Sequence, residues 1–406
     1  MPASDAALRH HPAFVLFWLA RVASTIAFQM QAVAVAWLVY DLTGSAFALG
    51  MVGLAQFVPA LVLALVVGHV ADRYDRPRIV RACQAAQCLT VAALALGAIS
   101  GGLTLMAIFA AIVTLGASRA FEMPTMQALL PNLVPPSVLP RAVAGSASAN
   151  QTAVIVGPAI GGFLYAGGAT VVFVASATLF FIAALLIAQV RPVTKQQASK
   201  EPASFRTLFG GIGFIASRPA VLGAISLDLF AVLLGGVVAL LPIYARDILE
   251  IGPSGLGMLR SAPAVGALAM SILLARFPLQ HRVGLIMFGG VAVYGLATIV
   301  FAVSAWFPLS LAALAVLGAA DMVSVVIRVS LIQLETPDDM RGRVSAVNSV
   351  FIGGSNQLGD FRAGVTAEAF GAVAAALVGG IGTLIVVGAW MRLFPVLVRA
   401  DRLAPR

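Results

Sequence analysis

Six charged residues stand inside long apolar stretches of this sequence, where ionisable side chains are rare. They are Arg21, Arg119, Glu122, Asp228, Asp321 and Arg328. A charge at the centre of a membrane span costs about 2.5–3.5 kcal/mol on insertion scales and usually marks a solute or proton pathway. Burial favours the protonated form of a carboxyl group, and a nearby arginine favours the ionised form. The pattern therefore predicts a proton-carrying acid, with Asp228 as the first candidate and Asp321 as the second.

The spacing of these charges suggests how they pair. Asp321 and Arg328 are seven residues apart, two turns along one helix face, with Ser324 between them. Arg119 and Glu122 are three residues apart and can pair along their own helix. The alternative for each pair is a structural ion pair that only holds helices together.

Uncharged polar residues in the same apolar stretches could give a ligand further donors and acceptors. They are Thr25, Gln29, Gln31, Asn150, Gln151, Asn348, Ser355, Asn356 and Gln357. Hydrogen bonds between membrane helices use the same residue types. Ligand contact and helix association both stay open for each of them.

The elements that position these residues follow from composition. The chain has 406 residues, of which 61% are hydrophobic and only 10% are charged, and ordinary globular chains carry about 25% charged residues. A transmembrane helix needs about 20 mostly apolar residues. The sequence predicts an all-α membrane protein with twelve such spans: 13–40, 46–67, 79–99, 103–130, 142–165, 169–190, 219–245, 255–277, 283–304, 307–334, 343–367 and 371–395.

Basic residues set the expected orientation of these spans. Most of the 25 Lys and Arg residues fall in loops on one side if both termini are cytoplasmic, as the positive-inside rule requires. We therefore expect a multi-pass protein of the plasma (inner) membrane. The net charge of +9 is then explained by loops that face anionic lipid, with no nucleic-acid partner.

An internal repeat divides the chain. HPAFVLFWLAR at 11–21 matches RPAVLGAISLD at 218–228, and LGM at 49–51 returns at 256–258, both at an offset of 207 residues. The repeat predicts two pseudo-symmetric six-helix bundles, 1–190 and 219–406, the second with a cytoplasmic tail. A cytoplasmic linker, 191–218, joins them and carries a short amphipathic helix at Ser204–Ser217. Because Arg21 and Asp228 are equivalent in the repeat, we expect them to pair across its axis.

One charged loop resembles a family signature. GHVADRYDRPR at 68–78 is similar to the loop between spans two and three of the major facilitator superfamily. Gly68, Asp72, Arg73 and Arg76 match it, and Arg78 stands where the family usually has another basic residue. The resemblance implies that spans one, four, seven and ten line a central cavity. It also implies that the loop latches the cytoplasmic side closed; a solvated loop that only sets topology is the alternative.

Further segments resemble the branch of that superfamily that contains enterobactin and drug exporters. GPAIGG at 157–162 is similar to the antiporter motif of span five, through Gly157, Pro158, Gly161 and Gly162. Residues 119–135 and 333–349 also resemble this branch, although Glu122 replaces its usual Gln. The resemblance implies export.

Other chemistry has no support in the sequence. Neither lysine stands in a P-loop frame. The four histidines, His10, His11, His69 and His281, lack the spacing of a metal site, and Cys83 and Cys88 are expected to be packing thiols. We expect no enzyme activity, no cofactor and no metal, so energy must come from an ion gradient.

These observations favour a proton-coupled exporter of small organic compounds, siderophore-like or drug-like, that works by alternating access. Its partners would be the small-molecule substrate, protons and the lipid bilayer, and the protein would be a monomer. A substrate importer of the same fold is one alternative. A non-transporting membrane receptor or scaffold is the alternative from another class.

Overall fold

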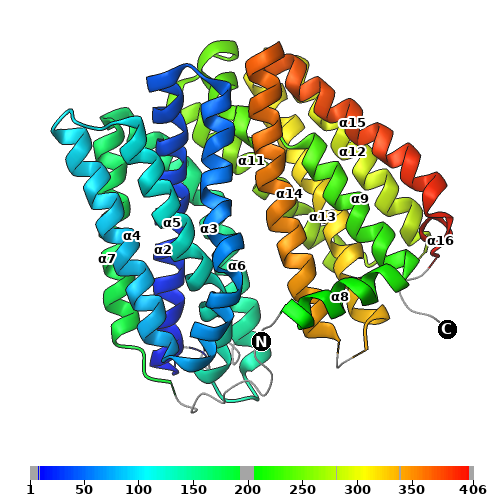
Figure 1. Ribbon diagram of the computed structural model, residues 1–406, viewed down its shortest axis with the longest axis horizontal. Coiled ribbons are helices and arrows are strands. Elements are labelled where there is room, and N and C mark those ends of the chain that lie inside the picture. Colours follow the sequence, from blue (N-terminus) through cyan, green and yellow to red (C-terminus); the bar gives the residue numbers. More distant parts are fainter. Residues whose placement is uncertain (1–7, 9, 193–204, 280, 338–339, 402–406) are drawn as a thin grey trace. The chain divides into compact units, whose positions relative to one another are not determined.

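The computed structural model describes residues 8, 10–192, 205–279, 281–337 and 340–401, and within these ranges it contains helices and turns but no strand (Figure 1). The helices of the first half are α2 (Pro12–Thr43), α3 (Ala46–Arg73), α4 (Arg76–Ile99), α5 (Leu105–Leu129), α6 (Leu139–Leu164) and α7 (Ala169–Ala188). Those of the second half are α8 (Phe205–Ser217), α9 (Pro219–Gly235), α10 (Leu241–Ile243), α11 (Gly252–Arg276), α12 (Val283–Val303), α13 (Phe307–Glu335), α14 (Arg341–Phe370), α15 (Ala372–Leu393) and α16 (Pro395–Val398).

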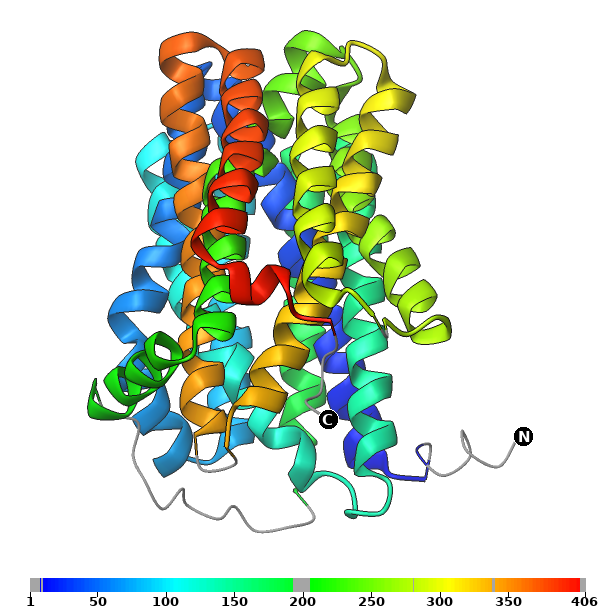
Figure 2. The same ribbon diagram turned by 90° about the vertical axis from the view of Figure 1, so that its right-hand side faces the viewer.

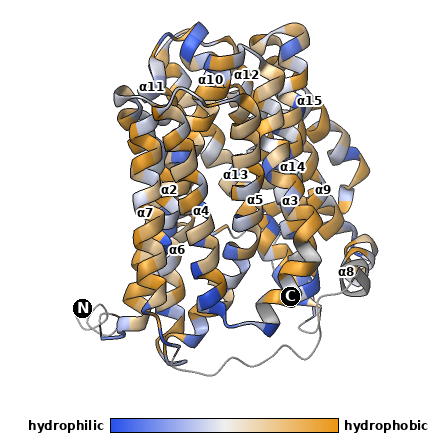
Figure 3. Cartoon of the chain, turned by 60° about the vertical axis from the view of Figure 1, so that its left-hand side comes forward, coloured by the Kyte–Doolittle hydropathy of each residue, from blue (hydrophilic) through white to orange (hydrophobic). Residues whose placement is uncertain are grey.

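Ten segments of the described chain are long and apolar enough to cross a membrane, and Figure 3 shows hydrophobic residues along the helices of both halves. The predicted spans 142–165 and 343–367 correspond to α6 and α14, which are not among these ten. With 26 and 30 residues they are long enough to span, but polar side chains interrupt them. The protein is thus a multi-pass all-α membrane protein, and the number twelve stays a prediction.

Span seven differs from the predicted continuous helix 219–245. Helix α9 ends at Gly235, Gly236 is extended, and the chain continues through the short turn η3 (Val238–Leu240), α10 and the π-helical turn η4 (Tyr244–Ile248). Two successive glycines weaken a helix because they lose the most backbone entropy on ordering. The predicted helix is therefore corrected to a broken one.

The chain forms two compact units. Unit 1 contains residues 1–42 and 55–203, and unit 2 contains residues 43–54 and 204–406. The first residues of α3 thus pack with unit 2, although the predicted first bundle ran without interruption to residue 190. The amphipathic helix expected at Ser204–Ser217 is α8, which packs on α14 and α9 and lies across their direction (Figures 1 and 2); Ser204 itself lies outside the described residues.

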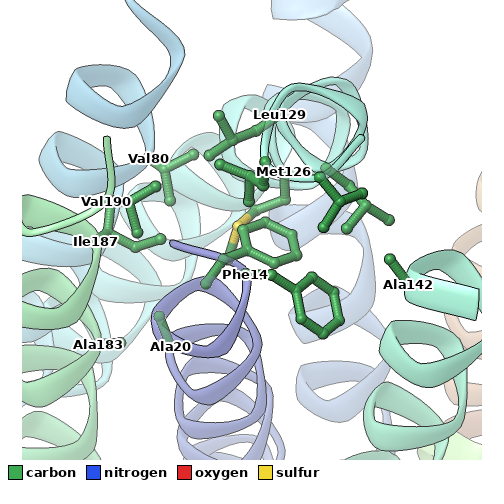
Figure 4. Packing of buried hydrophobic residues seen from close by; sticks show 13 residues of the cluster. Phe14, Ala20, Val80, Met126, Leu129, Ala142, Ala183, Ile187 and Val190 are labelled. Carbon is green, nitrogen blue, oxygen red and sulfur yellow. The ribbon is translucent and has the colours of Figure 1, made fainter. Parts of the chain in front are cut away.

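The core of unit 1 near the start of α2 joins five helices. Phe14 and Ala20 of α2 lie beside Val80, Met126, Leu129, Ala142, Ala183 and Ile187 from α4, α5, α6 and α7 (Figure 4). All of these side chains are buried. This packing fixes the rotation of α2 about its own axis. It therefore determines the direction of the Arg21 side chain, one residue after Ala20.

The core of unit 2 surrounds α9. Ala224, Leu227 and Ala231 of α9 pack with buried residues of α12, α13 and α15, among them Met287 and Ile327. These positions follow the helical spacing of three and four residues. Asp228 lies next to Leu227 in this sequence, and the packing therefore carries its carboxyl group into the interior of unit 2.

Candidate transport site

A buried ion pair lies at the centre of unit 2. The Arg328 guanidinium of α13 donates to a carboxylate oxygen of Asp228 on α9 at 2.5 Å, and the Ser324 hydroxyl donates to the other oxygen at 3.4 Å. Asp228 is 4% exposed and Arg328 is 2% exposed. Ser324 and Arg328 are four residues apart on α13, so one face of this helix supplies both donors.

Arg328 and Ser324 are partners of Asp228 that the sequence analysis did not propose. They bond the carboxylate within its own unit. Arg21 belongs to unit 1, where it donates to the Ser146 hydroxyl at 3.1 Å. The expected pair of Arg21 with Asp228 would join the two units and stays a prediction.

A small cavity adjoins the ion pair. It has an empty volume of about 210 Å³, part of it open, and its lining residues are Asp228, Ala231, Val232, Val291, Tyr294, Ala320, Asp321 and Ser324. Asp321 is half-buried, and no described residue forms an ion pair with it. Two carboxylates and one guanidinium meet here. The cavity therefore has one negative charge more than positive charges when both acids are ionised.

Two charged side chains of α14 hold the ends of the broken span seven. The Arg362 guanidinium donates to the carbonyl oxygen of Leu233, in the last turn of α9, at 3.1 Å. The Asp360 carboxylate accepts the N–H of Ala239, at the start of the next turn, at 3.2 Å. A cation at a helix C-terminus and an anion at a helix N-terminus both complement the helix dipole. The break is therefore a stabilised feature of unit 2.

Unit 1 contains a second buried acid. Glu122 of α5 is 1% exposed and accepts hydrogen bonds from Gln84 at 3.1 Å, Gln87 at 2.8 Å and Arg119 at 3.2 Å. The predicted pairing of Arg119 with Glu122 is confirmed. The Arg119 guanidinium also lies 4.6 Å from the centre of the Phe28 ring. Gln84 and Gln87 were missed by the sequence analysis, although two glutamines three residues apart in an apolar span could have revealed them.

The GPAIGG segment lets α6 approach α2 closely. A side chain at Gly157 would collide with Gln29, and one at Gly161 would collide with the backbone of Met30. Gly157, Pro158, Gly161 and Gly162 are all buried. Within unit 1 these glycines therefore determine how α2 packs, and with it the position of Arg21.

The charged loop joins α3 to α4. Gly68 and Arg73 lie near the end of α3, and Arg76 begins α4 and donates to the carbonyl oxygen of Ala128 at 2.8 Å. Arg78 pairs with Asp75 at 3.5 Å on an exposed surface. The side chain of Asp72 lies outside the described part of the chain, so its pairing stays a prediction.

The other candidate residues are dispersed. Gln31 and Asn348 are buried, and their side-chain oxygens have no hydrogen-bond partner among the described residues. Asn356 is exposed and donates to the Ile352 carbonyl of its own helix at 2.8 Å. In the described part of the chain, no cluster of His, Cys, Asp and Glu could hold a metal ion, and both cysteines are free thiols.

Buried charges inside apolar helices are typical of membrane transport proteins, and solved structures show the same fold. A bacterial homolog of the human lysosomal transporter Spinster, in an inward-facing and unoccupied conformation, matches with a TM-score of 0.75 and 13% identity, over 100% of both chains. A bacterial homologue of the iron transporter ferroportin, in an inward-facing state, matches with a TM-score of 0.70 and 16% identity, over 93% of this chain and 98% of that one.

Sequence relatives narrow the class. The chain is 26% identical to the enterobactin exporter EntS of Escherichia coli O1:K1, over 379 residues that make up 93% of this chain and 87% of the relative. Its identity to the enterobactin exporter EntS of Shigella boydii serotype 18 is the same over the same length. The family model for transmembrane secretion effectors matches residues 3–404. The chain belongs to this family of the major facilitator superfamily. It is a multi-pass membrane transporter of a small molecule.

Proposed function

We propose that this protein is a proton-coupled exporter that moves a small organic compound out of the cytoplasm across the inner membrane by alternating access. The observation that carries the proposal is the unit 2 cavity, where Asp228, Asp321 and Arg328 place two acids beside one cation in an apolar helix bundle. Two similarities support export: the chain matches the family of transmembrane secretion effectors, and it is similar to enterobactin exporters.

The two acids have different roles in this proposal. Asp228 stays ionised while Arg328 and Ser324 bind its oxygens, since a proton there would break the ion pair. Asp321 has no ion-pair partner among the described residues, and protonation of its carboxyl group breaks no such contact. We therefore place the transported proton on Asp321 and give Asp228 a positioning role, which reverses the order expected from sequence.

The gradient supplies the energy for export. A proton that crosses a potential of 100 mV contributes about 2.3 kcal/mol, and a pH difference adds to this. The loop with Gly68, Asp72, Arg73, Arg76 and Arg78 acts as the cytoplasmic latch, with both termini on the same side of the membrane. Closing of the latch excludes the cytoplasm while the substrate leaves on the opposite side.

Flux measurements in reconstituted vesicles test this function. The full-length protein is placed in sealed vesicles with an imposed pH gradient, and the fluxes of protons and of enterobactin, dyes and antibiotics are recorded together. We expect extrusion of at least one compound that depends on the gradient, and Asp321→Asn should abolish its coupling to protons while exchange continues. Gradient-independent transport by the wild type, or uptake in the opposite direction, would contradict the proposal.

Asp228→Asn is the matched comparison for Asp321→Asn, because both changes replace one cavity carboxylate by an amide of the same size. If Asp228→Asn alone removes proton coupling and Asp321→Asn retains it, the proton site is Asp228. If both variants retain it, Glu122 is the next acid to test.

A further inference from the structure

Two cations and one acid lie in the middle of the apolar helices α2 and α5 of unit 1. Arg21 and Arg119 are the cations, and Glu122 is the acid beside them. Glu122 is buried and receives three hydrogen bonds, from Arg119, Gln84 and Gln87. Its charge is therefore compensated by partners other than Arg21.

Arg21 has no comparable partner. Its recorded hydrogen bond goes to a neutral group, the Ser146 hydroxyl, at 3.1 Å, and no carboxylate of the described residues lies within 4.0 Å of it. A guanidinium has five N–H donors, so most of the hydrogen-bonding capacity of Arg21 remains for an added anion.

The neighbours of Arg21 on α6 are also suited to an anion. Ser146 and Asn150 are one helical turn apart, and the Asn150 side-chain oxygen accepts a hydrogen bond from the Thr25 hydroxyl at 3.1 Å. This bond orients the Asn150 amide, whose NH₂ group then remains as a donor. The polar groups between α2 and α6 thus present donors rather than carboxylates.

The same face of α2 provides an apolar part. Arg21, Thr25 and Phe28 follow the spacing i, i+4 and i+7, which places them along one side of the helix. The Phe28 ring is half-buried and is already in contact with the Arg119 guanidinium. A ligand that extends along this face meets a cation first and an aromatic ring one to two turns later.

We propose that Arg21, with Asn150 and Phe28, forms a substrate subsite of unit 1 that binds the anionic group of an amphiphilic compound, such as a carboxylate, sulfonate or phenolate. The inference rests on the proposed function, since it names the chemical class of the exported substrate. The planar guanidinium fork matches such oxyanions in a bidentate manner, and the ring of Phe28 contacts the apolar body. Arg119 takes no direct part because Glu122 neutralises it.

A pair of probes that differ by one anionic group tests the proposal. 1-Anilinonaphthalene-8-sulfonate carries a sulfonate, and N-phenyl-1-naphthylamine has the same aromatic body without it. Trp18 lies one turn before Arg21 and can report binding by energy transfer to either probe. The measurement uses full-length protein in lipid nanodiscs with the other three tryptophans changed to Phe (Trp37→Phe, Trp306→Phe, Trp390→Phe).

We expect saturable binding of the sulfonate that is at least about tenfold tighter than binding of the neutral probe, because hydrogen bonds to charged groups contribute about 1.5–3 kcal/mol. Arg21→Gln should reduce this preference to near one, and Arg21→Lys should keep part of it, since lysine retains the charge without the fork. Arg392→Gln, the same change at an exposed position of α15, is the control and should keep the full preference.

Equal affinity of the wild type for both probes would overturn the proposal, and so would an undiminished preference in Arg21→Gln. If Arg21→Gln does not give monodisperse protein, Arg21→Lys and the wild-type probe pair decide the result. Efflux of both probes from vesicles separates this inference from the proposed function. A sulfonate preference without any efflux supports the subsite and contradicts export, whereas equal efflux and equal binding of both probes supports export and contradicts the subsite.

Discussion

Removal of Arg328 should destabilise the protein more than removal of its partner Asp228. Both side chains are almost fully buried, and breaking a buried ion pair from one side typically costs about 3–5 kcal/mol. Arg328→Gln leaves Asp228 with the Ser324 hydroxyl and with the like charge of Asp321 across the cavity. Asp228→Asn leaves Arg328 with Asp321 two turns away on the same helix, so part of its charge remains compensated. We expect a loss of about 3–5 kcal/mol for the first change and a smaller loss for the second.

The assay is reversible unfolding of the full-length protein in mixed micelles, followed by tryptophan fluorescence. The double variant Asp228→Asn/Arg328→Gln should recover part of the loss, because it leaves no uncompensated charge at the pair. A cost below about 1 kcal/mol for Arg328→Gln, or additive effects in the double variant, would refute this account of the pair.

Three further changes test other parts of the molecule. Gly161→Ala should cost about 1–3 kcal/mol of unfolding free energy in the same assay, because its Cβ would overlap the Met30 backbone; Gly388→Ala, which meets nothing within 4 Å, is the control. Glu368 lies beyond the predicted span 343–367. Its carboxylate accepts hydrogen bonds from the Phe47 N–H and the Ser45 hydroxyl, and these bonds hold its pKa below the usual range. These bonds should therefore persist above the usual Glu pKa of about 4.3 and be lost only as the pH falls through the lowered value. Relative to the intrinsic exchange rate at each pH, the Phe47 amide should lose protection in Glu368→Ala at pH 7 and in the wild type only in acid. Asp72→Asn should slow transport in vesicles without loss of folded protein, and wild-type turnover would argue against the latch.

Much of the architecture follows from local sequence. Apolar runs about 20 residues long predict membrane helices because the bilayer leaves the backbone few other ways to satisfy its polar groups. The amphipathic helix before Ser217 and the pairing of Arg119 with Glu122 were also predictable, since both depend on spacing within a single helix. Contacts of this kind need no knowledge of which helices are neighbours.

Contacts between helices were harder to predict from the sequence. Asp228 is bonded to Arg328, 100 residues later in the chain, and the spacing of the sequence did not suggest this pair. Gln84 and Gln87 bind Glu122 across 38 and 35 residues. Each of these bonds depends on the rotation of one helix against another, which is determined by close packing such as that of Gly157 and Gly161 against α2. A single sequence provides the candidates but not the rotation.

The break in span seven depends both on the local sequence and on contacts between helices. Gly235 and Gly236 were visible in the sequence, but they alone do not explain a break, because glycine costs only about 1 kcal/mol in a helix. The structure supplies the second cause. Arg362 caps the C-terminus of α9 by donating to the carbonyl oxygen of Leu233. Asp360 accepts a hydrogen bond from the N–H of Ala239 beyond the break. The two charges of α14 are two residues apart, and they bind opposite helix ends only if those ends lie close together. The broken helix therefore explains why an acid and an arginine are both placed in this part of α14.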